Sequence, residues 1–118
     1  MSAEKTFVAA LEDTSGHQPL LQGRPQTHGM RAGRVSLLPG QDCGEHSTSN
    51  HEEMLVFLAG EGTLIVENST SLRVGKGRIC YIPPESVHNV INTGHEPLVY
   101  IYCVAPAMQD KETLNEET

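Results

Sequence analysis

The sequence of 118 residues predicts an all-β barrel or sandwich. Three observations support this fold class. Short runs rich in β-branched and aromatic residues recur along the chain, turns containing Gly, Pro or Asn separate them about every 8 to 12 residues, and almost no stretch has a helical pattern. The length suits one domain with a single hydrophobic core.

Residues 1–29 are expected to form an N-terminal arm, in which residues 5–11 could be an edge strand or a short helix. Gly and Pro residues interrupt any longer element there, at Gly16, Pro19, Gly23 and Pro25. The barrel is expected over residues 30–106. Its strands are expected at residues 30–38, at 54–66 as two strands joined by a turn at 60–62, and at 71–74, 78–82, 88–91 and 98–104. Residues 107–118 are expected to be an acidic, solvated tail.

The strand expected at residues 54–59, MLVFLA, is apolar at both alternating sets of positions. Both of its faces should therefore be covered, one by the core and the other by a second sheet or another subunit, which makes a homodimer the expected assembly. Arg31 and Arg34 lie three positions apart on the preceding strand. They should face opposite sides of it, so that at most one can line an interior pocket.

Charge and composition exclude several classes of partner. The net charge is −7 and the eight Lys and Arg residues are scattered, so no nucleic-acid partner is expected. No apolar run approaches the roughly 20 residues of a membrane span, and the N-terminus does not resemble a signal peptide, so a cytoplasmic protein is expected. Three cysteines without CxxC spacing suggest small buried residues in a reduced protein, at Cys43, Cys80 and Cys103.

Residues 40–60 have the composition of a metal site. His46, His51, Glu52 and Glu53 fall within eight residues, directly before the most continuous apolar run in the chain. Such side chains beside a buried strand would be costly if left dry and without partners. A divalent transition metal such as Fe, Mn, Ni, Cu or Zn would satisfy them, because it accepts imidazole nitrogen and carboxylate oxygen together.

Two spaced motifs then give a resemblance to a known family. The first consists of Gly40, His46, Thr48, Glu53 and Gly60, and the second of Gly77, Pro83, Glu85, His88 and Asn92. Their order and spacing resemble the two motifs of the cupin superfamily, whose members are small jelly-roll barrels of the double-stranded β-helix type. This chain departs at two positions: Thr48 replaces the second His of a His-x-His pair, and Glu85 replaces a Gly.

The resemblance implies that His46, Glu53 and His88 bind the metal. Glu53 is preferred to Glu52 because it alone has the motif spacing to the following Gly, and strand alternation sends Glu52 to the other face. Thr48 would be a weak ligand, which leaves three possibilities. The site is an open triad of two His and one Glu, or His51 supplies a fourth ligand, or the barrel binds an organic ligand without metal.

The resemblance implies a metal-binding cupin protein that acts on a small molecule, as an oxygenase or an isomerase. The alternative is a non-catalytic module that binds or senses a small ligand. A general base is not evident, and the tyrosines qualify only if they point inward, at positions 81, 100 and 102. Asn92 should close a turn, and Glu85 should have a backbone conformation that a non-Gly residue tolerates. The other histidines are expected on the surface: His17, His28 and His95.

Overall fold

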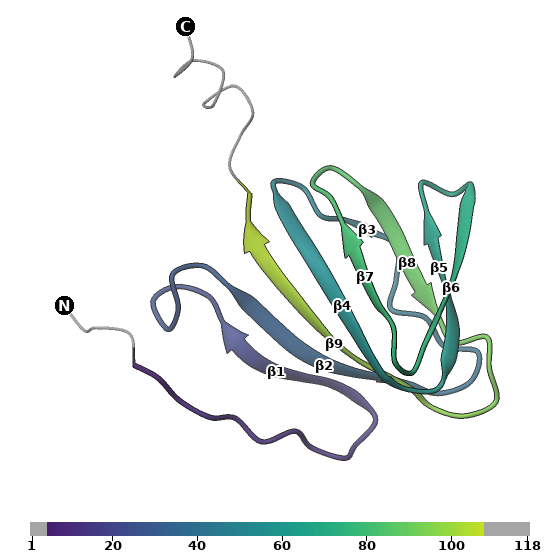
Figure 1. The fold of residues 1–118 in the computed structure, drawn as a ribbon, viewed down its shortest axis with the longest axis horizontal. Helices are drawn as coiled ribbons and strands as arrows, with labels where there is room; N and C mark the ends of the chain where they lie inside the picture. The colour runs from purple at the N-terminus through teal and green to yellow at the C-terminus, as the bar shows by residue number, and fades with distance from the viewer. Residues whose placement is uncertain (1–4, 108–118) are drawn as a thin grey trace, which may run out of the picture.

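Two antiparallel sheets face each other in the computed structural model, which describes residues 5–107 (Figure 1). A five-stranded sheet has the order β1-β2-β9-β4-β7, and a four-stranded sheet has the order β3-β8-β5-β6. The strands are β1 (Gly16–Gln22), β2 (Arg31–Leu37), β3 (His46–Ser47), β4 (His51–Ala59), β5 (Glu61–Val66), β6 (Thr70–Gly75), β7 (Ile79–Ile82), β8 (Val87–Ile91) and β9 (Leu98–Pro106). The all-β double-stranded β-helix predicted from the sequence is confirmed.

The hydrophobic core fills the space between the sheets at one end. Its most deeply buried apolar side chains include Leu55, Phe57, Leu64, Val90 and Leu98. They come from β4, β5, β8 and β9, so both sheets contribute. Successive side chains of a strand point to opposite faces, and these residues occupy the positions that face the space between the sheets. The other end of the barrel stays open and forms the pocket described below.

The N-terminal arm differs from its prediction. Residues 5–11 contain neither a strand nor a helix, whereas Gly16–Gln22 forms β1 at the edge of the five-stranded sheet and pairs with β2. Pro19 was expected to interrupt such an element. It is tolerated because an edge strand leaves one row of backbone groups unpaired, so the missing N–H of proline costs no ladder hydrogen bond there. The pairing has an irregularity between Pro19 and Leu21.

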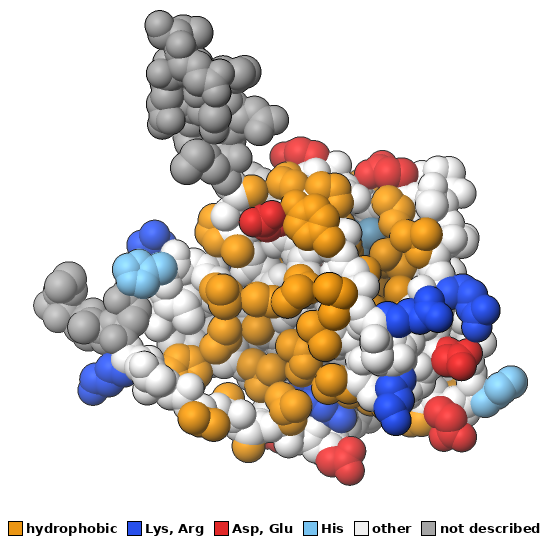
Figure 2. All heavy atoms as spheres, in the orientation of Figure 1, with side chains coloured by type: hydrophobic (Ala, Val, Ile, Leu, Met, Phe, Trp, Pro, Cys, Tyr) orange, Lys and Arg blue, Asp and Glu red, His pale blue; other side chains and the backbone are white. Residues whose placement is uncertain are grey.

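The two faces of β4 differ in cover. Leu55 and Phe57 on the inner face are at most 2% exposed, whereas Met54 and Leu58 on the outer face are 41% and 40% exposed. Hydrophobic side chains gather where β4, β7 and β9 form the visible face of the molecule (Figure 2). Within residues 5–107, the rest of the chain therefore buries only the inner face of β4. A partner subunit on the other face stays a prediction, which light scattering on the purified chain would test.

Two further boundaries differ from the sequence prediction. β4 begins at His51, three residues earlier than expected, and the two-residue strand β3 was not predicted. The expected tail lies outside the described residues except at residue 107. Within the described part of the chain, no helix long and apolar enough to cross a membrane is present.

Candidate metal centre

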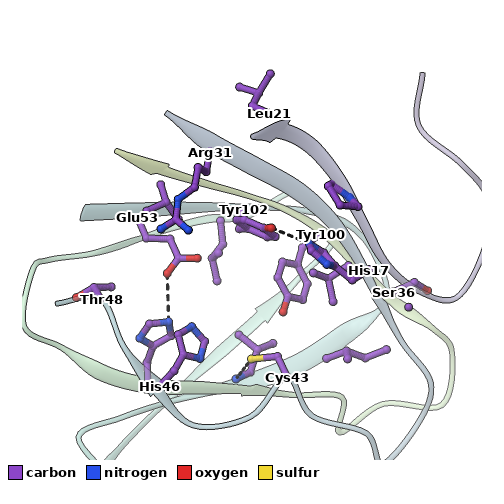
Figure 3. Close-up of a pocket in the computed structure, with 18 of the residues that line it drawn as sticks. His17, Leu21, Arg31, Ser36, Cys43, His46, Thr48, Glu53, Tyr100 and Tyr102 are labelled. Atoms are coloured by element: carbon purple, nitrogen blue, oxygen red, sulfur yellow. Dashed lines mark hydrogen bonds and ion pairs between the residues drawn. The ribbon is translucent and has the colours of Figure 1, made fainter. Parts of the chain in front are cut away.

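A pocket of about 840 Å³ opens between the sheets. The inner face of the five-stranded sheet forms one wall, and β3 and β8 with the segment before β3 form the other (Figure 3). Its lining combines aliphatic side chains with a small set of polar groups, the composition typical of a small-molecule site.

His46, Glu53 and His88 come together in it. Each offers one ligand atom, and these atoms lie within 4.8 Å of one another. The two histidines are cross-strand partners on β3 and β8, with ring centroids 4.3 Å apart, while Glu53 reaches them from β4 on the opposite sheet. The cluster therefore depends on the packing of one sheet against the other, and not on any local segment.

The electrostatics of the cluster suit a cation. Glu53 is 8% exposed, and its Oε1 lies 3.2 Å from Nε2 of His88. Burial lowers the pKa of His88, but the hydrogen bonds to Glu53 and to the Ser86 carbonyl outweigh it, so the pKa is raised overall. The buried carboxylate of Glu53 thus has His88 as its partner in the metal-free protein. Two imidazoles and one carboxylate are also donors that a divalent transition ion accepts, so the residues fit such an ion.

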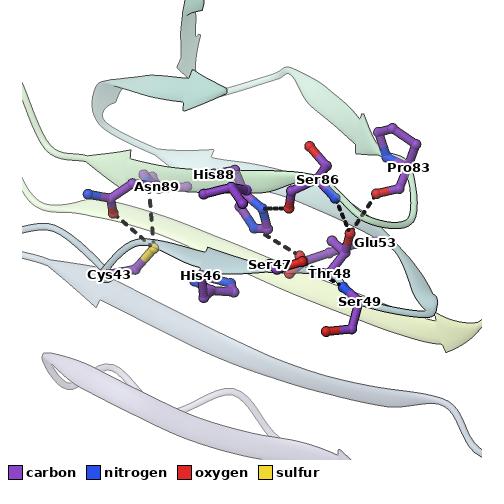
Figure 4. A network of polar contacts seen from close by, with 12 residues as sticks. Cys43, His46, Ser47, Thr48, Ser49, Glu53, Pro83, Ser86, His88 and Asn89 are labelled. Atoms are coloured by element: carbon purple, nitrogen blue, oxygen red, sulfur yellow. Dashed lines mark hydrogen bonds and ion pairs between the residues drawn. The ribbon is translucent and has the colours of Figure 1, made fainter. Parts of the chain in front are cut away.

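Thr48, which replaces the expected second His, has a structural role. Its hydroxyl donates a hydrogen bond to the Pro83 carbonyl at 2.6 Å and accepts one from the Ser86 N–H at 3.0 Å (Figure 4). The Thr48 N–H also donates to the Ser86 carbonyl at 3.1 Å. Thr48 thus joins the turn after β3 to the turn before β8. We call these three hydrogen bonds the Thr48 clasp, because they link the segments that carry His46 and His88.

His51 does not join the cluster, although β4 begins early enough to include it. It pairs with Pro106 at the end of the five-stranded sheet, two residues beyond Glu53, and it does not line the pocket. Two residues of strand correspond to about 7 Å. Glu52 points to the other face, as predicted, and accepts a hydrogen bond from the Tyr81 hydroxyl at 2.9 Å. Tyr81 is therefore not an inward-pointing base.

Two other motif positions shape turns. Asn92 is buried; its amide nitrogen donates to the carbonyls of Leu37 and Glu96, and its oxygen accepts from the N–H of Gly94. Its predicted role in closing a turn is confirmed. Glu85 has φ of 58°, in the left-handed region that the motif Gly would adopt without strain. This small left-handed region is allowed to a non-Gly residue at some cost, so the structure agrees with the expectation that Glu85 has a conformation a non-Gly residue tolerates.

The pocket contains polar residues that the sequence did not single out. His17 was expected on the surface and remains exposed, but it lines the pocket, and its Nε2 lies 2.7 Å from the Tyr102 hydroxyl. The Tyr102 ring occupies the space over Gly33, where a Cβ would lie 2.6 Å from the ring. No local pattern marks His17, because its partner is 85 residues away in the sequence.

Tyr100 and Cys43 complete the interior. Burial raises the pKa of both the Tyr100 hydroxyl and the Cys43 thiol, so both groups stay protonated at neutral pH. Of the two arginines, Arg31 lines the pocket, whereas Arg34 lies on the other face of β2 and donates to the Thr14 carbonyl at 2.8 Å. The prediction that at most one of them lines a pocket is confirmed.

A family model described as the cupin domain matches residues 33–104, which include both motifs and all three residues of the cluster. The chain belongs to the cupin family. The cupin resemblance inferred from the two motifs is thus confirmed by a match over more than half of the chain.

Curated relatives and solved structures agree with this membership. The uncharacterized protein MJ1618 of Methanocaldococcus jannaschii is 35% identical over 69 residues, covering 58% of this chain and 53% of that protein. A glucose-6-phosphate isomerase of Pyrococcus abyssi is 28% identical over 60 residues, covering 48% of this chain and 32% of the relative. The matches therefore span about half or less of these relatives. An RmlC-like cupin from M. jannaschii superposes with a TM-score of 0.72 at 20% identity, covering 94% of this chain and 96% of the other.

Proposed function

We propose that this chain is a metal-dependent enzyme for a small oxygen-containing substrate, with isomerisation of a hydroxy-carbonyl compound as the favoured reaction. The observation that carries the proposal is the convergence of His46, Glu53 and His88 inside a pocket large enough for a small molecule. Three protein ligands leave coordination positions for substrate or water. A cupin fold by itself would not support an activity, since one fold hosts many functions.

His46, Glu53 and His88 would hold a divalent ion, and the ion would act as a Lewis acid on a carbonyl or hydroxyl oxygen. The choice of isomerisation is supported by the glucose-6-phosphate isomerases among the relatives, as far as the matched segment goes. It also agrees with the donor groups in the pocket. The phenols of Tyr100 and Tyr102 are neutral because burial raises their pKa, so they can donate hydrogen bonds to substrate oxygens.

Isomerisation of a hydroxy-carbonyl compound moves a proton between neighbouring carbon atoms, and this requires a base in the pocket. His17 is the candidate, because it lines the pocket and imidazole is the side chain that most often serves as a general base. Its Nε2 lies 2.7 Å from the Tyr102 hydroxyl, and the two rings stack with centroids 5.6 Å apart. In the tautomer that serves as base, Nε2–H donates to the Tyr102 oxygen, which leaves Nδ1 to accept the substrate proton and the Tyr102 O–H to donate to the substrate. His17 therefore has a defined orientation, although it lies on an edge strand.

An oxygenase is the second candidate, and one observation favours it. Two histidines and one carboxylate form the ligand type typical of non-haem iron enzymes that activate dioxygen. A non-catalytic ligand-binding module is the third possibility and would use the same pocket. These functions differ in their dependence on the metal and on oxygen, so a single set of assays separates them.

The test is to load metal-free protein with Fe(II), Mn(II), Ni(II) or Zn(II) under anaerobic conditions and to offer hydroxy-aldehydes, hydroxy-ketones and their phosphates, hydroxy-acids, diketones and phenols. Oxygen is admitted once the metal is bound, and product mass and oxygen uptake are then followed. Isomerisation predicts products of unchanged mass without oxygen uptake, including with Zn(II). Oxygen uptake with Fe(II) alone would favour the oxygenase. Binding of these compounds without turnover under every metal would contradict both enzyme proposals.

A comparison of variants inside and outside the pocket shows whether any turnover depends on the metal cluster. Glu53→Gln keeps the shape of the side chain but removes its charge, and should abolish activity together with metal binding. Replacement of an exposed histidine outside the pocket, His95→Ala, should leave both unchanged. Replacement of the proposed base, His17→Phe, should lower kcat without lowering metal content.

A further inference from the structure

We propose that the pocket is built for a small anionic ligand, whose carboxylate or phosphate group is bound by Arg31 on the wall opposite His46 and His88. The inference deepens the proposed function, since the other end of the ligand would lie at the metal cluster. It identifies a substrate class and a residue that selects for it. Arg31 lies outside both cupin motifs.

Strand register fixes the distance between Arg31 and the cluster. Arg31 on β2 is the partner of Val104 on β9, and Val104 is also the partner of Glu53 on β4. The three residues form one row across the inner face of the sheet, and all three line the pocket. Two strand spacings place the Cα atoms of Arg31 and Glu53 about 10 Å apart. Both side chains extend from this row into the pocket, so the space left between their charged groups is shorter than the Cα distance. It suits a short compound whose anionic group lies within a few atoms of an oxygen that reaches the cluster.

The Arg31 guanidinium is available to a ligand. In Figure 3 it points from the β2 wall into the pocket. Over residues 5–107, no hydrogen bond or ion pair joins it to another group. Arg34 and Arg73 have partners: Arg34 donates to the Thr14 carbonyl at 2.8 Å, and Arg73 lies 4.0 Å from Glu61. Among the arginines of the described residues, Arg31 alone lines the pocket. The planar guanidinium of Arg31 therefore keeps its donors for a carboxylate or phosphate, which it can bind through two parallel hydrogen bonds.

The backbone beside Arg31 makes room for its side chain. Gly23 follows β1, has φ of +81°, and lies against the aliphatic part of Arg31, since a Cβ at this position would be 3.1 Å from Cγ. A larger residue there would push against the side chain. The side chain thus lies along the wall formed by the ends of β1 and β2, next to the pocket.

The charges around the pocket favour an anion. The chain carries a net charge of −7, yet Glu53 is the only acidic residue and Arg31 the only Lys or Arg among the residues that line the pocket. A divalent ion at the cluster would give the lining a net positive charge. A neutral ligand would leave Arg31 without a charged partner, whereas an anionic group would neutralise it.

The test compares ligands that differ by one anionic group. Succinate and succinamate have nearly the same size and differ by one carboxylate, while 2-phosphoglycolate and glycolate differ by a phosphate. Their binding to the Zn(II)-loaded chain is measured by calorimetry. A charge-assisted, bidentate contact predicts a preference of about tenfold or more for the probe with the extra anionic group in at least one pair. The pair with the larger preference identifies the anion as carboxylate or phosphate.

Arg31→Gln should remove this preference, Arg31→Lys should restore part of it, and Arg73→Gln should retain it because Arg73 is on β6 outside the pocket. Arg31 is exposed, and thermal unfolding of each variant verifies that the fold is intact. An equal preference in the wild type and Arg31→Gln would overturn the proposal, as would its absence in the wild type.

Failure of the proposed function is recognised separately. Metal content and turnover are measured on the same preparations, so a chain that keeps an Arg31-dependent preference without turnover contradicts the enzyme and supports the anion site. If no ion binds, the same titrations on the metal-free chain decide the role of Arg31. The preference should again depend on Arg31, and its independence of Arg31 would again overturn the assignment.

Discussion

The two ends of the pocket differ in how they are held. At the metal end, Glu53 and His88 are at most 8% exposed, while His46 is exposed and is joined to them through the Thr48 clasp and the pairing of β3 with β8. At the mouth, His17 and Arg31 are exposed and come from β1 and β2, outside both motifs. The buried end is suited to hold an ion in fixed geometry. The open end is suited to select the ligand, because its side chains can change without disturbing the ion.

The largest expected effect is a loss of metal affinity that occurs in a variant of the metal end but not in a variant of the mouth. Glu53→Gln should lower metal affinity by more than the roughly 10- to 100-fold that the loss of a supporting partner costs, because it removes a charged ligand. Tyr102→Phe, at the mouth, should leave metal affinity unchanged. Competition titration with a chelator measures both. Equal losses in the two variants would mean that the ends are not independent.

The next effect tests whether the Thr48 clasp supports the metal end. Thr48→Val removes the hydroxyl and leaves the buried Ser86 N–H without an acceptor, which should lower the free energy of unfolding by about 1–3 kcal/mol. Metal affinity should fall by about 10- to 100-fold. Thr48→Ser retains the hydroxyl and is the matched control. Chemical denaturation and chelator competition provide the measurements; an unchanged affinity in Thr48→Val would contradict a supporting role.

The metal end should also respond to pH. The pKa of His88 is raised above its ordinary value of 6.5 in the metal-free protein. Its protonated form therefore contributes stability that is present below about pH 6.5 and is lost as pH rises through the raised value. A bound ion must displace this proton, so metal affinity should rise with pH over the same range, by up to about tenfold per pH unit. Chelator competition at several pH values measures it, and a flat profile would contradict the proton held between His88 and Glu53.

The smallest effect concerns a turn at the metal end. Glu85→Gly replaces a left-handed residue by one that adopts this conformation freely, and should raise the free energy of unfolding by up to about 1 kcal/mol. Metal affinity should stay the same, since the Glu85 side chain does not line the pocket. Thermal unfolding and metal titration of the same variant decide. Destabilisation would show that the Glu85 side chain has a role of its own.

The two ends also differ in how well the sequence predicted them. His46, Glu53 and His88 could be placed because motif spacing records which strand positions face inward. Thr48 was recognised as a departure, but its clasp was not, because the contact joins two turns 35 residues apart in the sequence.

At the mouth, β1 was missed because Pro19 argues against a strand unless its place at the sheet edge is known. His17 therefore appeared to be a surface histidine. Alternation along the strand predicts that Arg31 and Arg34 face opposite sides, but it does not show which of the two faces the pocket. The register with β9 and β4 resolves this, and register was not available from local patterns.

The central claim is that His46, Glu53 and His88 alone hold the ion. The most direct test is elemental analysis of the wild type, His88→Ala and His51→Ala, each purified without a chelator or a His-tag. The account predicts one transition-metal ion per chain in the wild type and in His51→Ala, and almost none in His88→Ala. Full metal content in His88→Ala, or its loss in His51→Ala, would contradict the account.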